Sequence, residues 1–341
     1  MTTIKKPSLK SQKHQMTVDF VELLNIHGVS GKEHDVRDYL VEKLDSLVDT
    51  MRIDTYGNLL AEKTCGTGEG AEIILSAHMD TVKGVLKKRT LKFDGDIITS
   101  SKGALGADDR AGIAIILDVL RRVESIDFNG KIKVSFSREE EIGCVGASNI
   151  DPRWYENADL AIVVDRRGNR DIVVGTWGLT FCSNAVGYFF EEVGKLVDME
   201  WKCVEGGVSD AMTFSGEGIN SVNLSAGYMN EHTSNEYVSL EAMRETSLLI
   251  CQSLAVVNSF YQSFGDVPNE NDWIEKGAKY NKYYYESTFD EGLLKEDMWI
   301  EEGGTYVYEI DGEIVIVQGN NEIVLSKEEY KSLTWQIEKF I

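Results

Sequence analysis

The sequence contains no long apolar run. No segment reaches the roughly 18 consecutive apolar residues that a membrane-spanning helix needs, so none is predicted to cross a bilayer. Residues 1–15 are polar and lysine-rich, and they lack the apolar stretch of a signal peptide. These two absences predict a cytoplasmic protein that does not associate with a membrane.

Cysteine is scarce and is not arranged in pairs. The 5 cysteines are an odd number, and none belongs to a C-x-x-C motif. Paired cysteines at regular spacing would indicate a disulfide framework. We therefore expect reduced thiols, which are typical of the cytoplasm.

Positive charge is also in short supply. The chain has 35 Lys and Arg residues against 57 Asp and Glu residues, a net charge of −22. An anionic surface repels nucleic acids and acidic membranes, so neither is an expected partner. Half of this net negative charge lies in residues 265–341, which contain 18 acidic residues, 7 lysines and no arginine.

The chain is expected to divide into three parts. Its 341 residues suffice for one large α/β domain with an appendage. We predict a polar tail at residues 1–15, a main domain at residues 16–264 and a small acidic α+β appendage at residues 265–341. The appendage is rich in tyrosine and contains no histidine, so no metal is expected there.

The appendage has patterns of its own. Strands at residues 305–310 and 313–318 are predicted to form a β-hairpin through a two-residue Asp-Gly turn. A last helix is predicted to begin at Ser326, which would form a capping box with Glu329.

Within the main domain, strand patterns alternate with helix patterns. The predicted strands are residues 51–54, 58–62, 72–77, 131–137, 160–164 and 222–224. The predicted helices are residues 18–26, a helix that begins at a capping box formed by Ser30 and Glu33, residues 111–123 and residues 240–260. This alternation implies an α/β fold, with a mixed, mostly parallel central sheet and helices on both faces.

Seven polar side chains occur in five short motifs along the main domain. They are His78, Asp80, Asp108, Glu140, Glu141, Asp165 and His232. Histidine and carboxylate side chains together are common ligands of zinc-type cations. Three of the motifs begin where a predicted strand ends, and sites in open α/β sheets form at the carboxyl edge of the strands. If each of the five motifs supplies one ligand, the set suggests two metals that share one carboxylate. Such a two-metal site is suited to hydrolysis.

Each motif taken alone has an ordinary structural explanation. Asp108 could cap the helix that follows it, His78 could be a buried residue at the end of a strand, and the acidic run at 139–141 could be solvated. Asp165 could pair with a neighbouring arginine, and His232 could be a loop histidine. The presence of all parts of a two-metal site together favours the functional interpretation.

As a set, the motifs resemble the di-zinc, or co-catalytic metal, exopeptidase superfamily. This superfamily includes single-domain aminopeptidases, tetrahedral aminopeptidases, peptidase T and the glutamate carboxypeptidases. The matching segments are SAHMDTV (76–82), GALGADDRAGIA (103–114), EEEIGCVGA (139–147), VVDRRG (163–168) and GYMNEHTSNEYVSL (227–240). The likeness extends over residues 16–262, and it implies the phosphorylase/hydrolase-like core of these zinc peptidases as the catalytic domain.

The resemblance implies a metal ligand set. His78 and Asp165 would bind one metal, Glu141 and His232 would bind the other, and Asp108 would bridge the two. The superfamily often has a cis peptide bond after the bridging aspartate, so the bond that follows Asp108 is a candidate.

The resemblance also implies two further roles. Glu140 would act as the general base and then as the general acid. Asp80 would accept the second N–H of His78 and so fix the orientation of its ring. Glu139 departs from the more usual Asp or Gln at its position, which leaves open which adjacent acidic pair carries the roles. We favour Glu140 and Glu141 because they directly precede the Ile-Gly step.

Asp210 lies in a further segment, Gly-Val-Ser-Asp-Ala at residues 207–211. It could contribute to a pocket for the substrate amine, or it could be an ordinary helix N-cap residue.

No insertion of domain size is expected in the main domain. Only 66 residues separate Asp165 from His232, and only 29 separate His78 from Asp108. The lidded and the tetrahedral branches of the superfamily insert a domain in one of these intervals. In layout, the chain is therefore most similar to the single-domain, lidless aminopeptidases.

The resemblance implies a metal-dependent exopeptidase. The first candidate is an aminopeptidase that hydrolyses N-terminal residues of peptides with a water that bridges two zinc-type ions; cobalt or manganese could replace zinc. One alternative is an N-acyl amino acid amidohydrolase or a carboxypeptidase, for which Arg110, Arg166 and Arg167 could bind a substrate carboxylate. Another is a non-catalytic binding module. The expected partner is a peptide or a small amide, and the tyrosine-rich tail could serve as a surface for homo-oligomer assembly.

Overall fold

The computed structural model describes most of the chain. It covers residues 9–261, residue 264 and four strands at residues 298–301, 305–310, 313–318 and 321–326. The helix predicted to begin at Ser326 lies outside the described residues, apart from Ser326 itself, which ends a strand. All 5 cysteines lie within the described part, and all are free.

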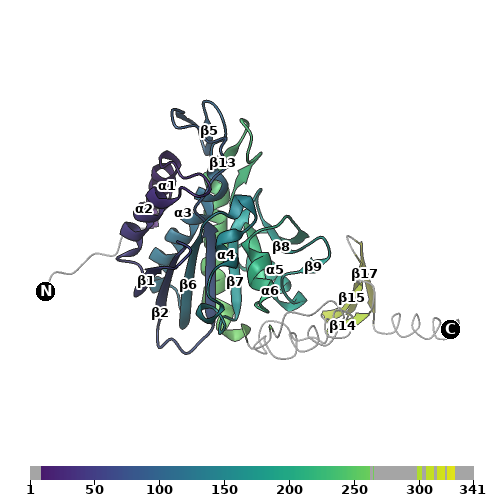
Figure 1. Cartoon of the computed structure of the whole chain (residues 1–341). Helices are drawn as coiled ribbons and strands as arrows, with labels where there is room; N and C mark the ends of the chain where they lie inside the picture. The colour runs from purple at the N-terminus through teal and green to yellow at the C-terminus, as the bar shows by residue number, and fades with distance from the viewer. Residues whose placement is uncertain are drawn as a thin grey trace.

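A nine-stranded mixed sheet forms the centre of the described residues (Figure 1). Its strands are β1 (Thr50–Ile53), β2 (Leu59–Cys65), β3 (Glu72–His78), β6 (Gly130–Ser137), β7 (Leu160–Arg166), β8 (Asp171–Thr176), β9 (Leu179–Thr180), β10 (Lys202–Glu205) and β11 (Ser221–Ser225). The order is β1-β2-β6-β3-β7-β11-β8-β10, and β9 pairs with β8. The central strands β6, β3, β7 and β11 run parallel, whereas β1 and β2 are antiparallel additions at one edge. The prediction of a mixed, mostly parallel sheet is therefore confirmed.

The central strands are apolar throughout because both faces of the sheet are covered. In β3, Ile73 and Leu75 belong to one hydrophobic core, and Ile74 between them belongs to a second core. In β7, Ile162 and Val163 are divided between the same two cores. Successive side chains of a strand point to opposite faces, so the two cores lie on the two faces of the sheet.

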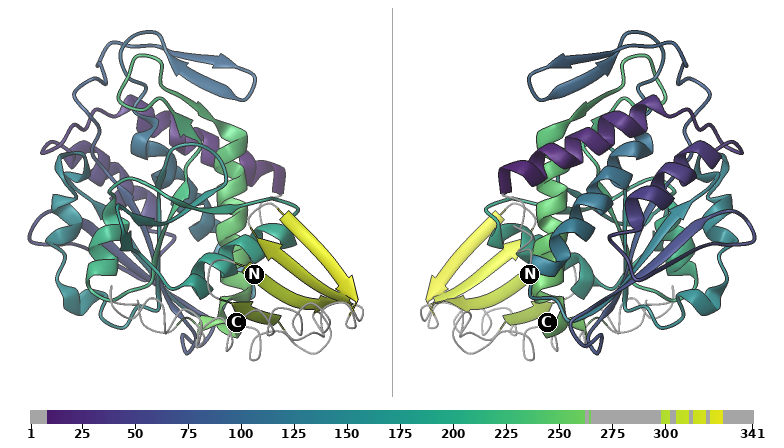
Figure 2. Two further views of the ribbon diagram at one scale, coloured as in Figure 1. Left: turned by 90° about the vertical axis from the view of Figure 1, so that its right-hand side faces the viewer. Right: turned by 90° about the vertical axis from the view of Figure 1, so that its left-hand side faces the viewer.

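Helices supply the other half of each core (Figures 1 and 2). The helices are α1 (Leu9–Asn25), α2 (His34–Leu44), α3 (Ala107–Arg122), α4 (Val145–Ser148), α5 (Asn184–Leu196), α6 (Asp210–Gly216) and α7 (Leu240–Val256). Helix α3 packs against α1, α7, β3 and β7, and its apolar residues belong to the first core. Helix α6 packs against β7 and β11, and its Phe214 belongs to the second core. The two helices thus cover opposite faces, as predicted.

A smaller four-stranded sheet was not predicted. It consists of β4 (Leu91–Asp94), β5 (Ile97–Ser100), β12 (Tyr228–Met229) and β13 (Tyr237–Ser239), in the order β12-β13-β5-β4. Figure 2 shows the β4–β5 hairpin at the top of the molecule. The loop between β12 and β13 carries His232, so this small sheet holds one of the candidate ligands.

The intervals between the candidate ligands contain no inserted domain. The residues between Asp165 and His232 supply β8, β10 and β11 to the main sheet and α5 and α6 to its faces. The residues between His78 and Asp108 supply the β4–β5 hairpin, its flanking loops and the first residue of α3. This agrees with the lidless layout expected from the sequence.

The predicted start of the second helix is wrong. Helix α2 begins at His34, three residues later than a cap at Ser30 would allow. The hydroxyl of Ser30 donates a hydrogen bond to Asp80 instead, and Glu33 accepts one from the backbone N–H of Gly31 and one from Arg138. These partners hold the loop against the candidate site.

Other element boundaries differ by less. Helix α1 begins at Leu9, earlier than predicted, and α7 ends at Val256 with a short 3-10 turn after it. The hairpin of the appendage is confirmed with the predicted bounds, β15 (Thr305–Ile310) and β16 (Glu313–Gln318). Two further strands, β14 (Met298–Glu301) and β17 (Asn321–Ser326), flank it.

A buried aromatic residue lies at the predicted end of the main domain. Phe264 is buried, its ring packs on Phe189 of α5, and its carbonyl accepts a hydrogen bond from Ser183. These contacts are compatible with a boundary near residue 264, and the three-part division of the chain stays a prediction. Across the described residues, no helix combines the length and the apolar character needed to cross a bilayer.

Candidate active site

The candidate residues converge at the carboxyl edge of the central strands. His78 is the last residue of β3, and Asp165 lies next to the last residue of β7. The acidic pair Glu140 and Glu141 follows β6 in a short 3-10 turn. Because β6, β3 and β7 are parallel neighbours, their carboxyl ends lie side by side.

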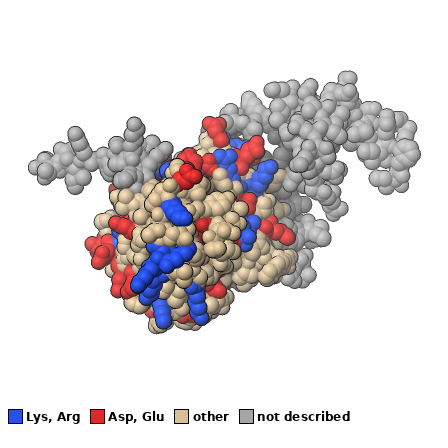
Figure 3. All heavy atoms as spheres, turned by 90° about the horizontal axis from the view of Figure 1, so that it is seen from above, with Lys and Arg blue, Asp and Glu red and all other residues tan. Residues whose placement is uncertain are grey.

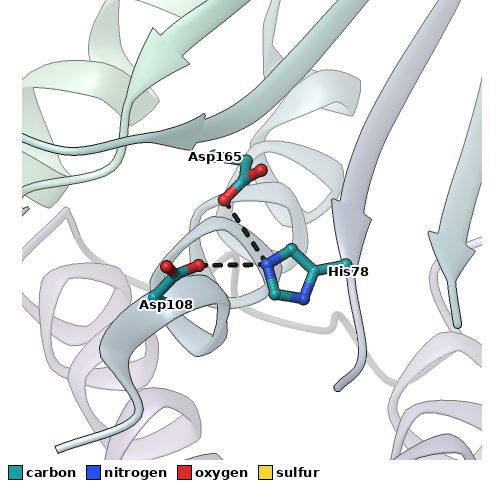
Figure 4. A group of neighbouring side chains, drawn as sticks. All are labelled: His78, Asp108 and Asp165. Atoms are coloured by element: carbon teal, nitrogen blue, oxygen red, sulfur yellow. Dashed lines mark hydrogen bonds and ion pairs between the residues drawn. The ribbon is translucent and has the colours of Figure 1, made fainter. Parts of the chain in front are cut away.

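One cluster consists of His78, Asp108 and Asp165 (Figure 4). Nε2 of His78 lies 3.0 Å from Oδ1 of Asp108 and 3.4 Å from Oδ1 of Asp165. Asp108 reaches the cluster from the beginning of α3, and the peptide bond between Asp108 and Asp109 is cis, as the resemblance implied. Tyr228 donates a hydrogen bond of 2.9 Å to Asp165, which fixes that carboxylate.

A second cluster consists of Asp108, Glu141 and His232. Nε2 of His232 lies 3.0 Å from Oδ2 of Asp108 and 2.8 Å from Oε2 of Glu141. The two clusters therefore share Asp108, and each of its carboxylate oxygens faces a different histidine. His232 is the most accessible member, with 46% of its side chain exposed, whereas the other members are largely buried.

Asp80 holds both His78 and the acidic turn. Nδ1 of His78 lies 3.0 Å from the backbone carbonyl oxygen of Asp80 and 3.3 Å from its Oδ1. The carboxylate also accepts hydrogen bonds from the backbone N–H groups of Glu140 and Glu141 and from the hydroxyl of Ser30. Burial opposes ionisation, but the hydrogen bond and charge of His78 lower the pKa of Asp80 to about 2. Asp80 is thus an ionised anchor that leaves Nε2 of His78 facing the cluster.

The structure separates the three acids in a row. Glu139 has a positive φ of 53° and accepts a hydrogen bond from the hydroxyl of Tyr56, away from the two clusters. Oε2 of Glu140 lies 3.9 Å from Nε2 of His78, and Glu141 contacts His232. The pair that faces the clusters is Glu140 and Glu141.

Behind Glu140 lies a third group of polar side chains. The thiol of Cys144 lies 3.3 Å from Oε1 of Glu140, and Asp210 completes the group. Asp210 is only 1% exposed and accepts a hydrogen bond from Ser137. Helix α6 is capped by Ser209, not by Asp210. Asp210 is therefore neither the cap nor an accessible pocket residue; it packs behind Glu140.

The carboxylates crowd one another in a buried space. Burial and the charge of Asp165 raise the pKa of Glu140 to about 9. Burial and the charge of Asp108 raise the pKa of Asp165 to about 7, although His78 opposes this shift. Hydrogen bonds to Asp108 and to a second carboxylate raise the pKa of His232 to about 10. The site gathers more negative charge than its two imidazoles neutralise.

These features fit divalent cations. Each cluster offers one imidazole nitrogen and two carboxylate groups whose ligand atoms lie within 4.8 Å of one another. Oε1 of Glu141 is buried and has no hydrogen-bond partner. A cation would satisfy that oxygen and reverse the repulsion among the carboxylates. Imidazole and carboxylate together suit zinc-type ions.

One supporting residue was missed at the sequence level. Glu236 is buried, and its carboxylate accepts hydrogen bonds from the backbone N–H groups of Gly106, Ala107 and Asp108 at 2.9, 2.7 and 3.3 Å. It therefore satisfies the free N–H groups at the beginning of α3 and holds the segment that carries Asp108. The sequence places Glu236 in the last matching motif, but nothing in that motif signals a contact 128 residues away.

Sequence comparison finds peptidases among the proteins that resemble parts of the chain. The pattern of the M42 glutamyl aminopeptidase family matches residues 83–172. A putative aminopeptidase from Acetivibrio thermocellus is 42% identical over 57 residues, which are 17% of this chain and 16% of that protein. The chain spans well under two thirds of the length of the first curated relatives that it matches, from 16% to 58%.

Structural comparison agrees on the fold. The aminopeptidase PepT from Bacillus cereus matches with a TM-score of 0.66 and 18% identity, over 71% of this chain and 98% of that chain. The TET1 peptidase of Pyrococcus horikoshii, which can assemble into a tetrahedron or a large octahedral shell, matches with a TM-score of 0.58 and 17% identity, over 70% and 98% of the two chains. The resemblance to the exopeptidase superfamily indicated by the motifs is therefore confirmed, and the chain has the fold of the PepT and TET1 peptidases.

Proposed function

We propose that the chain is a metal-dependent aminopeptidase that removes N-terminal residues from peptides. The observation that carries this proposal is the position of Asp108, whose two carboxylate oxygens each lie 3.0 Å from the Nε2 atom of a different histidine. One carboxylate shared by two imidazole-containing clusters is the arrangement expected of a two-metal hydrolytic site.

The two clusters suggest how the ligands would divide between two cations. His78 and Asp165 would hold one divalent ion, Glu141 and His232 would hold the other, and Asp108 would be the shared ligand. Zinc is the proposed metal, and cobalt or manganese are the alternatives for the same ligands. Such ions, when bound, polarise a carbonyl group and lower the pKa of water towards neutrality.

Glu140 is the proposed proton carrier. Its carboxylate lies beside the first cluster without belonging to either ligand set, and its side chain is only 12% exposed. Glu140 accepts a proton from the attacking water and delivers it to the leaving amine, so one residue serves as base and then as acid. The carboxylate of Asp80 accepts a hydrogen bond from the backbone N–H of Glu140 and so keeps Glu140 in place.

The amidohydrolase or carboxypeptidase alternative needs a cationic clamp for a substrate carboxylate. The three arginines considered for that role bind the protein's own groups: Arg110 binds the carbonyl of Met79, Arg166 binds Asp171, and Arg167 binds Glu231. Arg110 is also almost completely buried. These contacts favour the aminopeptidase. A non-catalytic binding module would not need the base that Glu140 provides.

A homo-oligomer is proposed as well. The TET1 peptidase with the same fold can assemble into closed shells. For this chain, light scattering on a size-exclusion column measures the assembly directly, and a mass equal to the 38.2 kDa monomer would contradict it.

The function is tested with a mixture of short peptides. Half have a free N-terminus and half are N-acetylated, and the protein is supplied with zinc or treated with a chelator. We expect mass spectrometry to show loss of single residues from the free amino ends only, and no loss after chelation. Release of acetyl groups or of C-terminal residues would assign the alternative activity, and no turnover in any sample would favour the binding module.

A further inference from the structure

A lysine-rich segment stands out against the acidic chain. Residues 83–102 contain six cationic side chains and two acidic ones, a net charge of +4 in a chain whose net charge is −22. Five of the cations are exposed lysines, which we call the lysine rim: Lys83, Lys87, Lys88, Lys92 and Lys102. Figure 3 shows Lys and Arg side chains gathered on the face seen from above.

Both ends of this segment lie against the candidate site. The backbone N–H of Ala104 donates a hydrogen bond of 3.0 Å to the carbonyl of Gly84, and Val85 forms a β-bridge with Ala104. Gly84 also lies close to the backbone of His232, because a Cβ added there would be 3.9 Å from the carbonyl oxygen of His232. The rim thus begins beside the ligand loop and continues outward along the β4–β5 hairpin.

Within the segment itself, the acids do not cancel the positive charge of the rim. Of the two acids in the segment, Asp96 accepts hydrogen bonds from Ser239 and Arg244, and only Asp94 adds an exposed negative charge. Burial lowers the pKa of His27, and nearby cations, Lys87 first among them, lower it further. A local positive potential therefore acts at this edge of the site.

Such a potential has a specific use in an acidic protein. A net charge of −22 repels an acidic peptide at long range. Exposed lysines are flexible and strongly hydrated, so they attract anions without fixing one geometry. Charges on a rim mainly change the rate of association and its dependence on salt.

We propose that the lysine rim attracts peptide substrates that carry acidic side chains after the N-terminal residue. This inference rests on the proposed aminopeptidase activity. The N-terminal residue lies at the metal ligands, so only the following residues extend outward to the exposed lysines. The preference therefore concerns the body of the peptide and is separate from any preference for the residue that is removed.

The test compares two peptides with the same N-terminus, Ala-Ala-Glu-Glu-Glu and Ala-Ala-Gln-Gln-Gln, with the zinc-loaded full chain. At about 0.01 M ionic strength, where the screening length is about 30 Å, we expect kcat/KM to favour the acidic peptide by about tenfold. At about 1 M, where the screening length is about 3 Å, the preference should vanish. The double variant Lys87→Glu/Lys88→Glu should abolish or invert it, and Lys87→Gln/Lys88→Gln should reduce it.

A matched control changes two exposed lysines elsewhere. The variant Lys195→Glu/Lys202→Glu has the same change in net charge and should keep the preference. Equal kcat/KM for the two peptides in the unaltered chain, or the same loss of preference in the control variant, would overturn the inference. If neither peptide is cleaved, the proposed function fails. The inference is then tested by fluorescence anisotropy of the same peptides, labelled at the C-terminus. Tighter, salt-sensitive binding of the acidic peptide would support the inference, and equal binding of the two peptides would overturn it.

Discussion

Asp108 and Glu140 lie close together but have separable roles. Asp108 contacts both candidate histidines and belongs to both clusters. Glu140 lies beside the first cluster but belongs to neither. We expect Asp108→Ala to lose metal as well as activity, because both ligand sets lose a member.

Glu140→Gln keeps the size of the side chain and should keep metal. Turnover should fall about 10²–10⁴-fold, because the variant lacks the carboxylate that carries the proton. Metal content after dialysis and kcat on a cleaved peptide measure the two effects, and near-normal kcat in Glu140→Gln would refute the assignment.

Glu236 is expected to support both stability and metal binding. Replacing it with Ala leaves three backbone N–H groups near Asp108 without their acceptor, and each buried donor left unsatisfied costs about 1–3 kcal/mol. We expect Glu236→Ala to lower the free energy of unfolding by at least about 2 kcal/mol and to weaken zinc binding. Glu236→Gln retains one acceptor oxygen and should recover part of both losses.

The control for Glu236 is a nearby exposed acid. Glu241 in α7 has 65% of its side chain exposed and pairs with Arg244 on the surface. Glu241→Ala should change stability by less than about 1 kcal/mol and leave zinc binding unchanged. Urea unfolding and zinc titration measure these effects, and equal results for the two positions would contradict the role of Glu236.

At the level of single residues, the sequence predicted positions that follow from strand ends. His78 and Asp165 could be placed together because each lies at the carboxyl end of an apolar strand. Glu236 could not be placed, since its partners lie about 130 residues away and its own neighbours are polar. Ser30 was assigned to the wrong partner because a capping box is a local pattern, and the competing acceptor, Asp80, is distant in sequence.

Among the elements, α3 fits closely against the sheet. Gly112 lies where α3 meets β7, and an added Cβ would be 2.0 Å from the carbonyl oxygen of Val164 and 2.5 Å from Oδ1 of Asp109. We expect Gly112→Ala to destabilise the protein by at least about 2 kcal/mol, because the helix must move away from the strand. Gly216→Ala at the end of α6 meets nothing within 4 Å and is the matched control. Urea midpoints compare the two variants, and an equally small shift in both would contradict this packing.

Elements differ in how far their sequences specify them. The strands β3 and β7 could be predicted because both faces are buried, which makes their residues continuously apolar. The small sheet could not be predicted because β12 and β13 have only two and three residues and β4 is mostly exposed. Such strands form because their neighbours hold them, and their own patterns are too short to show a period.

For the molecule as a whole, metal should stabilise the fold. The site gathers carboxylates from separate strands, helices and loops, so cations that bind them bind only the folded chain. At a free zinc concentration of about 100 times Kd, one site adds about 2.7 kcal/mol. This corresponds to a rise in Tm of about 5–10 °C for a domain of this size. Differential scanning calorimetry with zinc and with a chelator measures it, and an equal rise in the Asp108→Ala variant would exclude these residues as its source.

Helix α3 has no solvent-exposed face over most of its length, because every residue from Ala107 to Leu120 is buried. Its amide hydrogens therefore have no local route to water, and their exchange with deuterium requires the opening of the sheet and the helices on either side. Protection factors in α3 should match the global free energy of unfolding, while those in the loop around His232 should be far lower. Asp108 would then keep its place until the whole domain unfolds, whereas the exposed loop of its partner His232 would open far more often.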